Sequence, residues 1–357
     1  MFARIASRLT RIREAARYRS VPGQLIDLVT HKMKLNLAPY DYYAFEFYKG
    51  GKTWDEKSRY VGKHGSAYWP YEMNALRYNL LFTHKYIEKL MLKGAGLPTA
   101  QLLALVGENG DVRTEPQLRE LLKSLPHDVV VKPVSGTHGR NVLVLSRSGA
   151  ELRAGGKACS VHDVWQHVRS DLARGFLIEE KLTNAPEISA LYPASLNTFR
   201  IVTIKTLDKR WCVAAAYLRV GAGGGVVDNI AAGGILVQVD ADGCTRAAHR
   251  DGQSITHHPD TGALLVGVQL HGYRAACDLA LEASRRLGFV GTIGWDIAAT
   301  ARGPVVVEAN LWWTPSFQAA LGGVITDELA PSLNKRTPFM RWDKSMMYPR
   351  FDWRRRH

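Results

Sequence analysis

The segment Gly291–Trp313, GTIGWDIAATARGPVVVEANLWW, constrains the fold most, because it predicts a β-hairpin that carries several polar side chains. We expect a first strand over Val290–Ala298 and a second over the β-branched run Val305–Val307. The turn between them spans Thr300–Pro304, where a Gly-Pro pair interrupts the strand pattern. This hairpin decides which side chains can meet in its part of the chain.

Three oxygen-bearing side chains lie on the hairpin. Asp296 is on the first strand, whereas Glu308 and Asn310 end the second and share a face, because strand side chains alternate. Mg²⁺ prefers a few carboxylate oxygens and leaves its other positions to water or substrate phosphates. The set therefore suits Mg²⁺ with a nucleotide better than a closed zinc site. A hairpin whose polar residues are merely solvated is the alternative.

Composition predicts a globular protein. The chain has 357 residues, of which 46% are hydrophobic, enough for one large domain or two to three moderate ones. No apolar run approaches the roughly 20 residues of a membrane helix, and the N-terminus lacks the apolar region of a secretory signal. We therefore expect a cytoplasmic location. The four cysteines show no paired spacing, which predicts reduced thiols without a zinc site or disulfide framework.

The net charge of +14 favours acidic partners such as nucleotides, anionic polymers or membrane surfaces. Much of the excess lies in Arg4–Arg19 and Arg350–Arg356, without a nucleic-acid-binding signature, which argues against nucleic acid. Residues 1–20 predict a basic amphipathic helix. It would either contact an anionic membrane peripherally, serve as a transit peptide, or dock its apolar stripe on the protein, and we favour docking.

Residues 21–80 are rich in aromatic side chains and predict helices broken at Gly50–Gly51 and near Pro70. We expect an N-terminal cap with an aromatic core, which would also be placed to shape an acceptor site. From Thr83 onward the pattern predicts a helix that stops at Gly94–Gly96 and a strand over Gln101–Val106.

A buried strand ending at Lys132 is followed by the glycine-bearing loop Ser135–Arg140 and a second strand from Asn141. Backbone N–H groups in such a loop can cradle phosphate, and Lys132 would add a positive charge. An ordinary hairpin turn is the alternative for the loop. For Lys132 the alternative is an internal ion pair with Glu179 or Glu180.

The rest of the chain predicts alternating strands and helices. A helix around Ser160–Ala173 precedes a strand at Phe176–Ile178, which leads into a connection at Glu179–Leu182 able to offer backbone groups to a flat base. Two strands follow around a turn at Leu207–Lys209, and a helix over Tyr273–Leu287 precedes the hairpin.

In the order of these features the chain resembles the ATP-grasp superfamily of carboxylate–amine ligases over roughly Thr83–Ala320. The Lys85–Pro98 segment looks like a helix of D-alanine–D-alanine ligases. The motifs NTFRIVT and DNIAAGGI look like the sugar-transfer-associated ATP-grasp subgroup, related to α-L-glutamate ligases. The resemblance implies an α+β, ATP-grasp fold in which two α+β subdomains clamp ATP, with a mostly helical N-terminal region. Its expected divisions are a cap (1–82), a small lid subdomain (83–182), a large subdomain with the metal site (183–335) and a basic tail (336–357).

The resemblance also implies roles for individual residues. Lys85 and Lys132 match lysines that contact nucleotide phosphates, and Arg200 matches an arginine near the γ-phosphate, so Lys132 and Arg200 are the expected catalytic residues. Asp296, Glu308 and Asn310 match magnesium ligands. The other expected nucleotide contacts are the lid residues Ser135, Gly136, Thr137, His138 and Gly139, the adenine hinge Glu179, Glu180, Lys181 and Leu182, and the ribose-binding acid Glu187.

The function that the resemblance implies is an ADP-forming ligase that uses ATP and Mg²⁺. It would activate a carboxylate as an acylphosphate and join it to an amine, with small molecules, peptides or glycans as substrates. Leu311–Trp313 departs from the smaller residues of many ligases at the acceptor pocket. Two alternatives stay open: a phosphotransferase acting on a sugar or polyol hydroxyl, and a non-catalytic nucleotide-binding protein on an anionic surface.

Overall fold

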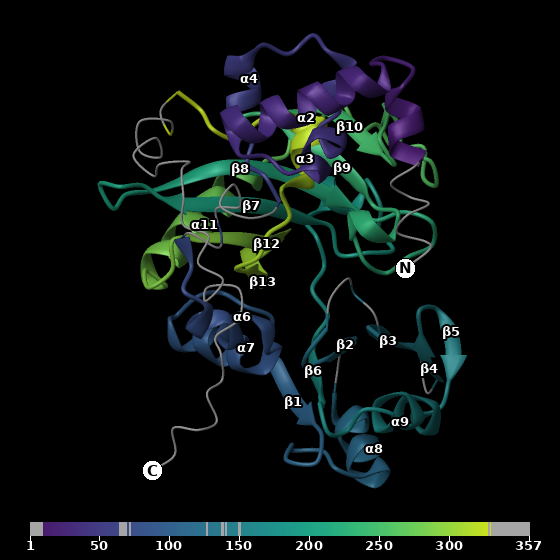
Figure 1. The fold of residues 1–357 in the computed structure, drawn as a ribbon. Helices are drawn as coiled ribbons and strands as arrows, with labels where there is room; N and C mark the ends of the chain where they lie inside the picture. Colours follow the sequence, from purple (N-terminus) through teal and green to yellow (C-terminus); the bar gives the residue numbers. More distant parts are fainter. Residues whose placement is uncertain are drawn as a thin grey trace.

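The computed structural model describes residues 10–63, 70, 73–125, 128–136, 139, 141–148, 151–327 and 329. Two antiparallel sheets, one of six strands and one of seven, form an α+β fold, and the helical N-terminal region lies over the larger sheet (Figure 1). No helix among these residues is long and apolar enough to cross a membrane. The expected C-terminal tail, the loop residues Thr137 and His138, and residues 1–9 lie outside the described residues.

The smaller sheet has the strand order β1-β6-β2-β3-β4-β5. Its buried apolar side chains pack against two amphipathic helices, and each helix begins with a capping box in which a hydroxyl accepts a hydrogen bond from a backbone N–H three residues on. The elements are β1 (Leu102–Val106), α8 (Glu115–Ser124), β2 (Val129–Pro133), β3 (Leu143–Ser148), β4 (Glu151–Ala154), β5 (Lys157–Cys159), α9 (Val161–Arg169) and β6 (Phe176–Glu180).

The larger sheet has the order β11-β10-β9-β8-β7-β12-β13, and its apolar face packs against α11 (Tyr273–Arg286). Its strand β12, next to the edge strand β13, is buried along its whole length, which fits the apolar and small residues of TIGWDIAAT. The strands are β7 (Thr198–Lys205), β8 (Trp211–Val220), β9 (Ile235–Val239), β10 (Thr245–Arg250), β11 (Gln253–Ile255), β12 (Thr292–Thr300) and β13 (Gly303–Asn310).

Short helices make up the rest of the fold. The N-terminal region packs around an aromatic core of Tyr42, Phe45, Phe47 and Tyr60, as expected from the sequence. Its first break comes at Asn36, in the left-handed conformation, earlier than the predicted break at Gly50–Gly51. The elements are α2 (Val21–Leu35), α3 (Pro39–Ala44), η1 (Phe47–Lys49), α4 (Trp54–Ser58), η3 (Leu76–Tyr78), α6 (Asn79–Thr83), α7 (Lys85–Gly94), α10 (Pro186–Ser189), η4 (Ile230–Ala232), η5 (Pro315–Phe317) and α12 (Gln318–Leu321).

The predicted hairpin is confirmed as β12 and β13, with a tighter turn than expected. One prediction was wrong at the end of β6, which continues through Glu179 and Glu180 instead of stopping at Ile178. The strand extends because both residues pair with β2, Glu179 opposite Val130 and Glu180 opposite Val129. All four cysteines are free, as predicted.

Asn74 connects the N-terminal region to the hairpin. Its side-chain Nδ2 donates to the carbonyls of Thr292 and Leu311, at 2.9 and 3.2 Å, and its Oδ1 accepts from the N–H groups of Gly291 and Thr292. Asn74 is 4% exposed, so water would not replace these partners.

We therefore expect Asn74→Ala to lower the free energy of unfolding by about 2–4 kcal/mol, because buried backbone groups lose their hydrogen bonds. Urea denaturation measures this loss. Asn109→Ala, at an exposed turn, is the matched control and should stay within about 0.5 kcal/mol of the original. Equal effects of the two substitutions would contradict the bridging role of Asn74.

Candidate functional site

A row of polar side chains crosses the larger sheet at one level. Glu308 on β13 lies opposite Asp296 on β12, which lies opposite Arg200 on β7, which lies opposite Tyr217 on β8. Directly opposed residues share a face, so these four side chains point to the same side of the sheet. Asn310 follows Glu308 by two residues and joins them on that face. The register of the strands therefore brings the three predicted metal ligands and Arg200 together.

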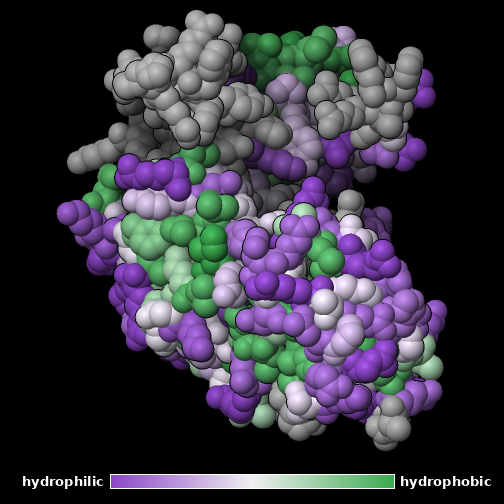
Figure 2. Space-filling model, turned by 90° about the horizontal axis from the view of Figure 1, so that it is seen from below, coloured by the Kyte–Doolittle hydropathy of each residue, from purple (hydrophilic) through white to green (hydrophobic). Residues whose placement is uncertain are grey.

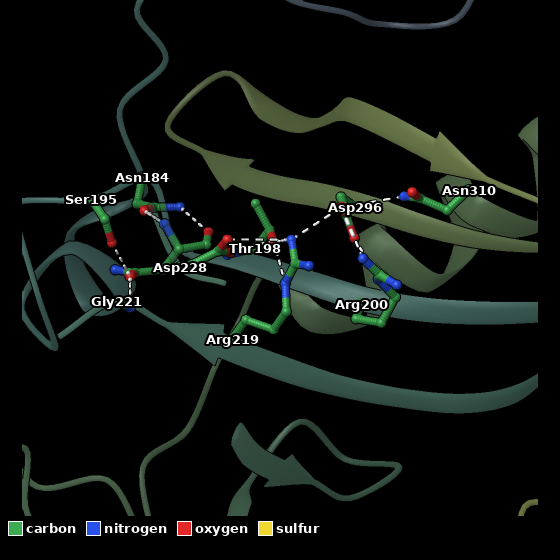
Figure 3. A network of polar contacts seen from close by, with 10 residues as sticks. Asn184, Ser195, Thr198, Arg200, Arg219, Gly221, Asp228, Asp296 and Asn310 are labelled. Carbon is green, nitrogen blue, oxygen red and sulfur yellow. Dashed lines mark hydrogen bonds and ion pairs between the residues drawn. The ribbon is translucent and has the colours of Figure 1, made fainter. Parts of the chain in front are cut away.

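Asp296 lies between two arginines. Its Oδ1 accepts from Arg200 Nε at 2.5 Å, and its Oδ2 accepts from Arg200 Nη2 and lies 3.1 Å from Arg219 Nη2 (Figure 3). Burial alone would raise the pKa of Asp296, but the two guanidinium groups outweigh burial and hold its pKa below the ordinary value. Asp296 is therefore ionised and bound on both oxygens by cationic groups.

Arg219 extends this network to a second buried carboxylate, Asp228. Asp228 Oδ2 accepts from the backbone N–H and the hydroxyl of Thr198, and its Oδ1 lies 3.3 Å from Arg219 (Figure 3). Burial raises the pKa of Asp228, and Arg219 opposes that rise. The neighbouring Asn197 side chain accepts from Ser195 and from the Gly221 amide, which anchors the start of β7 to the loop after β8.

In the structure Lys132 forms an internal ion pair with Glu179, which is the alternative that the sequence left open. Lys132 Nζ lies 2.8 Å from Glu179 Oε2, and Lys89 Nζ lies 3.2 Å from Glu179 Oε1. Burial raises the pKa of Glu179, but the two lysines outweigh it and hold that pKa below its ordinary value. Glu179 therefore binds two ammonium groups, one from β2 and one from α7.

Lys85, at the start of α7, forms an ion pair with Glu308 on β13. One helical turn on, Glu88 accepts a hydrogen bond at 2.5 Å from the backbone N–H of Ala309. Burial raises the pKa of Glu88 to about 8, with Glu308 adding to the rise. Helix α7 is thus bound through Lys85 and Glu88 to the larger sheet, and through Lys89 to the smaller one.

These groups surround a single cavity of about 1610 Å³ between the two sheets and the N-terminal region. Ligand pockets in proteins usually hold about 300–1,000 Å³, so this one has room for more than one small molecule. Of the predicted site residues, those that line it are Lys85, Lys132, Gly136, Gly139, Glu179, Glu180, Lys181, Leu182, Arg200, Asp296, Glu308 and Asn310.

Two predicted contacts lie elsewhere. Glu187, on α10, and Ser135 are not among the residues that line the cavity. The amides of Glu180 and Lys181 donate to the carbonyls of Gln101 and Asp128, at 3.0 and 3.1 Å, so these two N–H groups are already bonded within the protein.

The sugar-transfer-associated ATP-grasp family is matched over residues 66–332, which is most of the chain. The chain belongs to this family. ATP-grasp proteins bind ATP and are generally ATP-dependent ligases. No curated protein is a detectable relative.

Solved ATP-grasp structures resemble the chain weakly. A biotin carboxylase–ATP analogue complex from Campylobacter jejuni has a TM-score of 0.45 and 11% identity, and covers 70% of this chain and 44% of its own. An L-amino acid ligase from Bacillus licheniformis has a TM-score of 0.39 and 14% identity, and the match covers 67% of this chain and 42% of the ligase. A RimK domain ATP-grasp protein from Sphaerobacter thermophilus has a TM-score of 0.39 and 16% identity, and the match covers 69% of this chain and 65% of that protein. At these scores they add nothing to the family assignment, and the chain spans under half the length of the first two.

Four charged residues that line the cavity were missed from the sequence: Glu88, Lys89, Arg219 and Asp228. Lys89 follows Lys85 by one helical turn and so lies on the same face of α7, a spacing that the sequence contains. Arg219 follows Tyr217 by two residues on β8, so both side chains lie on the same face, and Arg219 lies opposite Thr198. Its position in the site depends on the strand register, which only the structure shows. Asp228 lies in an irregular glycine-rich segment without a periodic signal.

Asp296, Glu308 and Asn310 offer oxygen atoms, which are the ligands that a hard cation prefers. Asp296 Oδ1 accepts one hydrogen bond and keeps a second lone pair, and the Glu308 side chain is 30% exposed to the cavity. Asn310 Nδ2 lies 3.5 Å from Asp296, which orients the amide toward the same place. Among the described residues, no group of three or more His, Cys, Asp and Glu is arranged to hold a metal ion, and the set of Asp296, Glu308 and Asn310 contains only two residues of those types.

We expect Glu179→Gln to lower the free energy of unfolding by about 3–5 kcal/mol at pH 7, because two buried ammonium groups lose their carboxylate. The folded pKa of Glu179 is depressed, so its contribution is present above the unfolded pKa and is lost as pH falls through the folded pKa. The stability gap between the two proteins should narrow in acid.

Urea denaturation from pH 7 down to pH 3, without nucleotide, measures this gap. Glu120→Gln, whose carboxylate pairs with Lys123 on the exposed face of α8, is the control and should change little at any pH. A Glu179→Gln variant as stable as the original at pH 7 would contradict the paired arrangement.

Proposed function

We propose that this ATP-grasp protein is an ADP-forming carboxylate–amine ligase that uses ATP and Mg²⁺. The observation that supports the proposal most is the cross-strand row, because it places Asp296, Glu308 and Arg200 on one face of one cavity. Acidic oxygen ligands beside an arginine are what a phosphoryl-transfer site needs.

The nucleotide would occupy the part of the cavity between the two sheets. Lys132 and Lys85 would bind its phosphates, the glycines at 136 and 139 would let backbone approach them, and the segment ending at Leu182 would border the base. Both lysines are paired with carboxylates in this structure, so nucleotide phosphate would replace Glu179 and Glu308 as their partners in part.

The acceptor would occupy the other end of the cavity, beneath the N-terminal region. The cap lines the cavity with Arg11, Tyr43 and Lys63, and Trp312, after β13, lines it as well. The Trp312 indole donates to Asn79 at 2.5 Å, whereas Leu311 and Trp313 are buried in the core. Of the three residues that depart from many ligases, only Trp312 would therefore be able to contact an acceptor. Two cationic side chains at this end favour an acceptor that carries a carboxylate or another anionic group.

In the first step a carboxylate oxygen of the substrate would attack the γ-phosphorus of ATP, and the bond to the β–γ bridging oxygen would break, giving an acylphosphate and ADP. Arg200 and Lys132 would stabilise the charge on the phosphoryl oxygens. Mg²⁺, held by Asp296, Glu308 and Asn310, would neutralise phosphate charge. In the second step the amine would attack the acyl carbon and release phosphate and a proton, forming the amide.

A phosphotransferase is the second candidate, because the same residues can direct a hydroxyl to the γ-phosphorus. The two differ in the fate of phosphate, which a ligase releases and a phosphotransferase leaves on its product. Hydroxylamine captures an acylphosphate as a hydroxamate, so ATP-dependent hydroxamate formation with a panel of carboxylic acids separates them. Phosphorylated product without hydroxamate would refute the ligase.

We expect Glu308→Gln to keep the fold and to lower ATP turnover by at least about 100-fold, because it removes ligand charge where phosphoryl charge is neutralised. Release of ADP, measured with the acids that give hydroxamate, is the readout, and thermal unfolding checks the fold.

The matched control is Glu282→Gln, on the exposed side of α11, where the carboxylate pairs only with surface arginines. It should leave turnover unchanged. Full turnover in a folded Glu308→Gln protein would remove Glu308 from the metal site.

A further inference from the structure

Helix α2 exposes an apolar face. Val21, Leu25, Val29 and Met33 recur at every fourth residue and therefore line one side of the helix, and Ile26 lies beside them. The exposed fraction is 48% for Val21, 60% for Leu25 and for Val29, 64% for Ile26 and 70% for Met33. They are five of the thirteen large apolar side chains exposed among the described residues. We call these five residues the α2 face.

The opposite side of α2 is polar and buried. Gln24 is 1% exposed and donates to the carbonyls of Ile12 and Arg19, and His31 is 2% exposed and stacks on Phe47. Asp27 binds Arg19 and the Tyr42 hydroxyl. The helix is thus fixed to the aromatic core by these polar contacts and by Leu28 and Leu35, whereas the five residues of the α2 face are exposed. A stripe of this size on a helix that is otherwise well anchored indicates a surface for interaction.

The surroundings of the α2 face are basic. Lys32 and Lys34 are exposed on the same helix, and described residues 10–63 hold 11 Lys and Arg against 6 Asp and Glu, a difference of 11 − 6 = +5. An apolar helical stripe with flanking lysines is the pattern that binds at the boundary of an anionic bilayer, where acyl chains accept the apolar residues and headgroups accept the lysines.

Like charge disfavours the two occupants that this chain itself could supply. A second copy would bring an equal basic surface to the contact. The chain beyond the described residues, 330–357, carries 8 Lys and Arg against 2 Asp and Glu, so it too is repelled by the surroundings of α2. An anionic lipid surface complements both the charge and the apolar stripe.

We propose that α2 docks this protein on an anionic membrane surface. The segment 1–20, for which membrane contact is one of three alternatives from the sequence, directly precedes α2. Helix α2 lies at the end of the molecule away from the six-stranded sheet (Figure 1). The side of the molecule seen from below mixes hydrophilic and hydrophobic residues (Figure 2). Docking through α2 leaves the smaller sheet free to move over the cleft, and it holds the acceptor end of the cavity near the bilayer, because cap residues such as Tyr43 line that end.

Sedimentation with vesicles tests the proposal on the full chain. We expect it to bind vesicles of phosphatidylcholine and phosphatidylglycerol, to bind phosphatidylcholine alone far less, and to dissociate at high salt. The double variant Leu25→Ser/Val29→Ser should bind the anionic vesicles at least about tenfold more weakly, because two apolar side chains no longer enter the bilayer. Both positions are exposed, so its thermal unfolding should match that of the original.

The matched control, Leu207→Ser/Leu264→Ser, changes two leucines exposed on the larger subdomain, 44% and 49%, and should bind as the original does. Three outcomes overturn the proposal. The first is that the full chain stays in the supernatant, which means that something else, its own residues 330–357 included, covers the face. The second is that both double variants bind alike. The third is that light scattering shows a dimer that Leu25→Ser/Val29→Ser converts to a monomer, which makes the face a contact between copies.

Discussion

The ion pairs of α7 connect the two halves of the molecule, and the arrangement of the cleft depends on them. Lys85 binds Glu308 on the larger sheet, and Lys89 shares Glu179 on the smaller sheet with Lys132. Buried charges are costly unless they are paired, so each carboxylate fixes the position of the lysines around it. In the absence of nucleotide, these pairs hold the walls of the cavity at a defined separation.

The same pairs suggest how ligand binding would act on the two sheets. A nucleotide that supplies phosphate to Lys132 and Lys85 weakens their hold on Glu179 and Glu308, and it offers both lysines a common partner. Contacts between α7 and the sheets would then pass through the ligand. On the larger sheet we expect Asp296 to keep its two arginines, so that this half should change less than the smaller one.

The sequence was sufficient for the parts of the site that follow from local pattern. The alternation along the hairpin placed Asp296, Glu308 and Asn310 together, and the strand before the glycine loop placed Lys132 at its end. The sequence was insufficient where the pairing of distant strands determines the position of a side chain. Glu179 was expected in a connection, yet its pairing with β2 keeps it in the sheet and turns its carboxylate to two lysines.

The exposed stripe of α2 shows the same limit. The pattern of residues 21–35 predicts an amphipathic helix, but it does not show which side of the helix faces the protein. The contacts of Gln24, His31 and Asp27 show that the side carrying these polar residues faces inward. The position of Arg219 likewise depends on β8 pairing with β7. Long-range register is a property of the whole sheet, and no single segment of the sequence contains it.

We propose that Lys132 exchanges an internal carboxylate, Glu179, for a nucleotide phosphate. Calorimetric titration of Mg–ATP into Lys132→Met and into the original protein measures this most directly. We expect the variant to bind at least about tenfold more weakly, a loss of roughly 1.4 kcal/mol or more, because a charged phosphate contact is gone. Equal affinity in a variant that is folded before titration would show that Lys132 serves only Glu179, and it would contradict the claim.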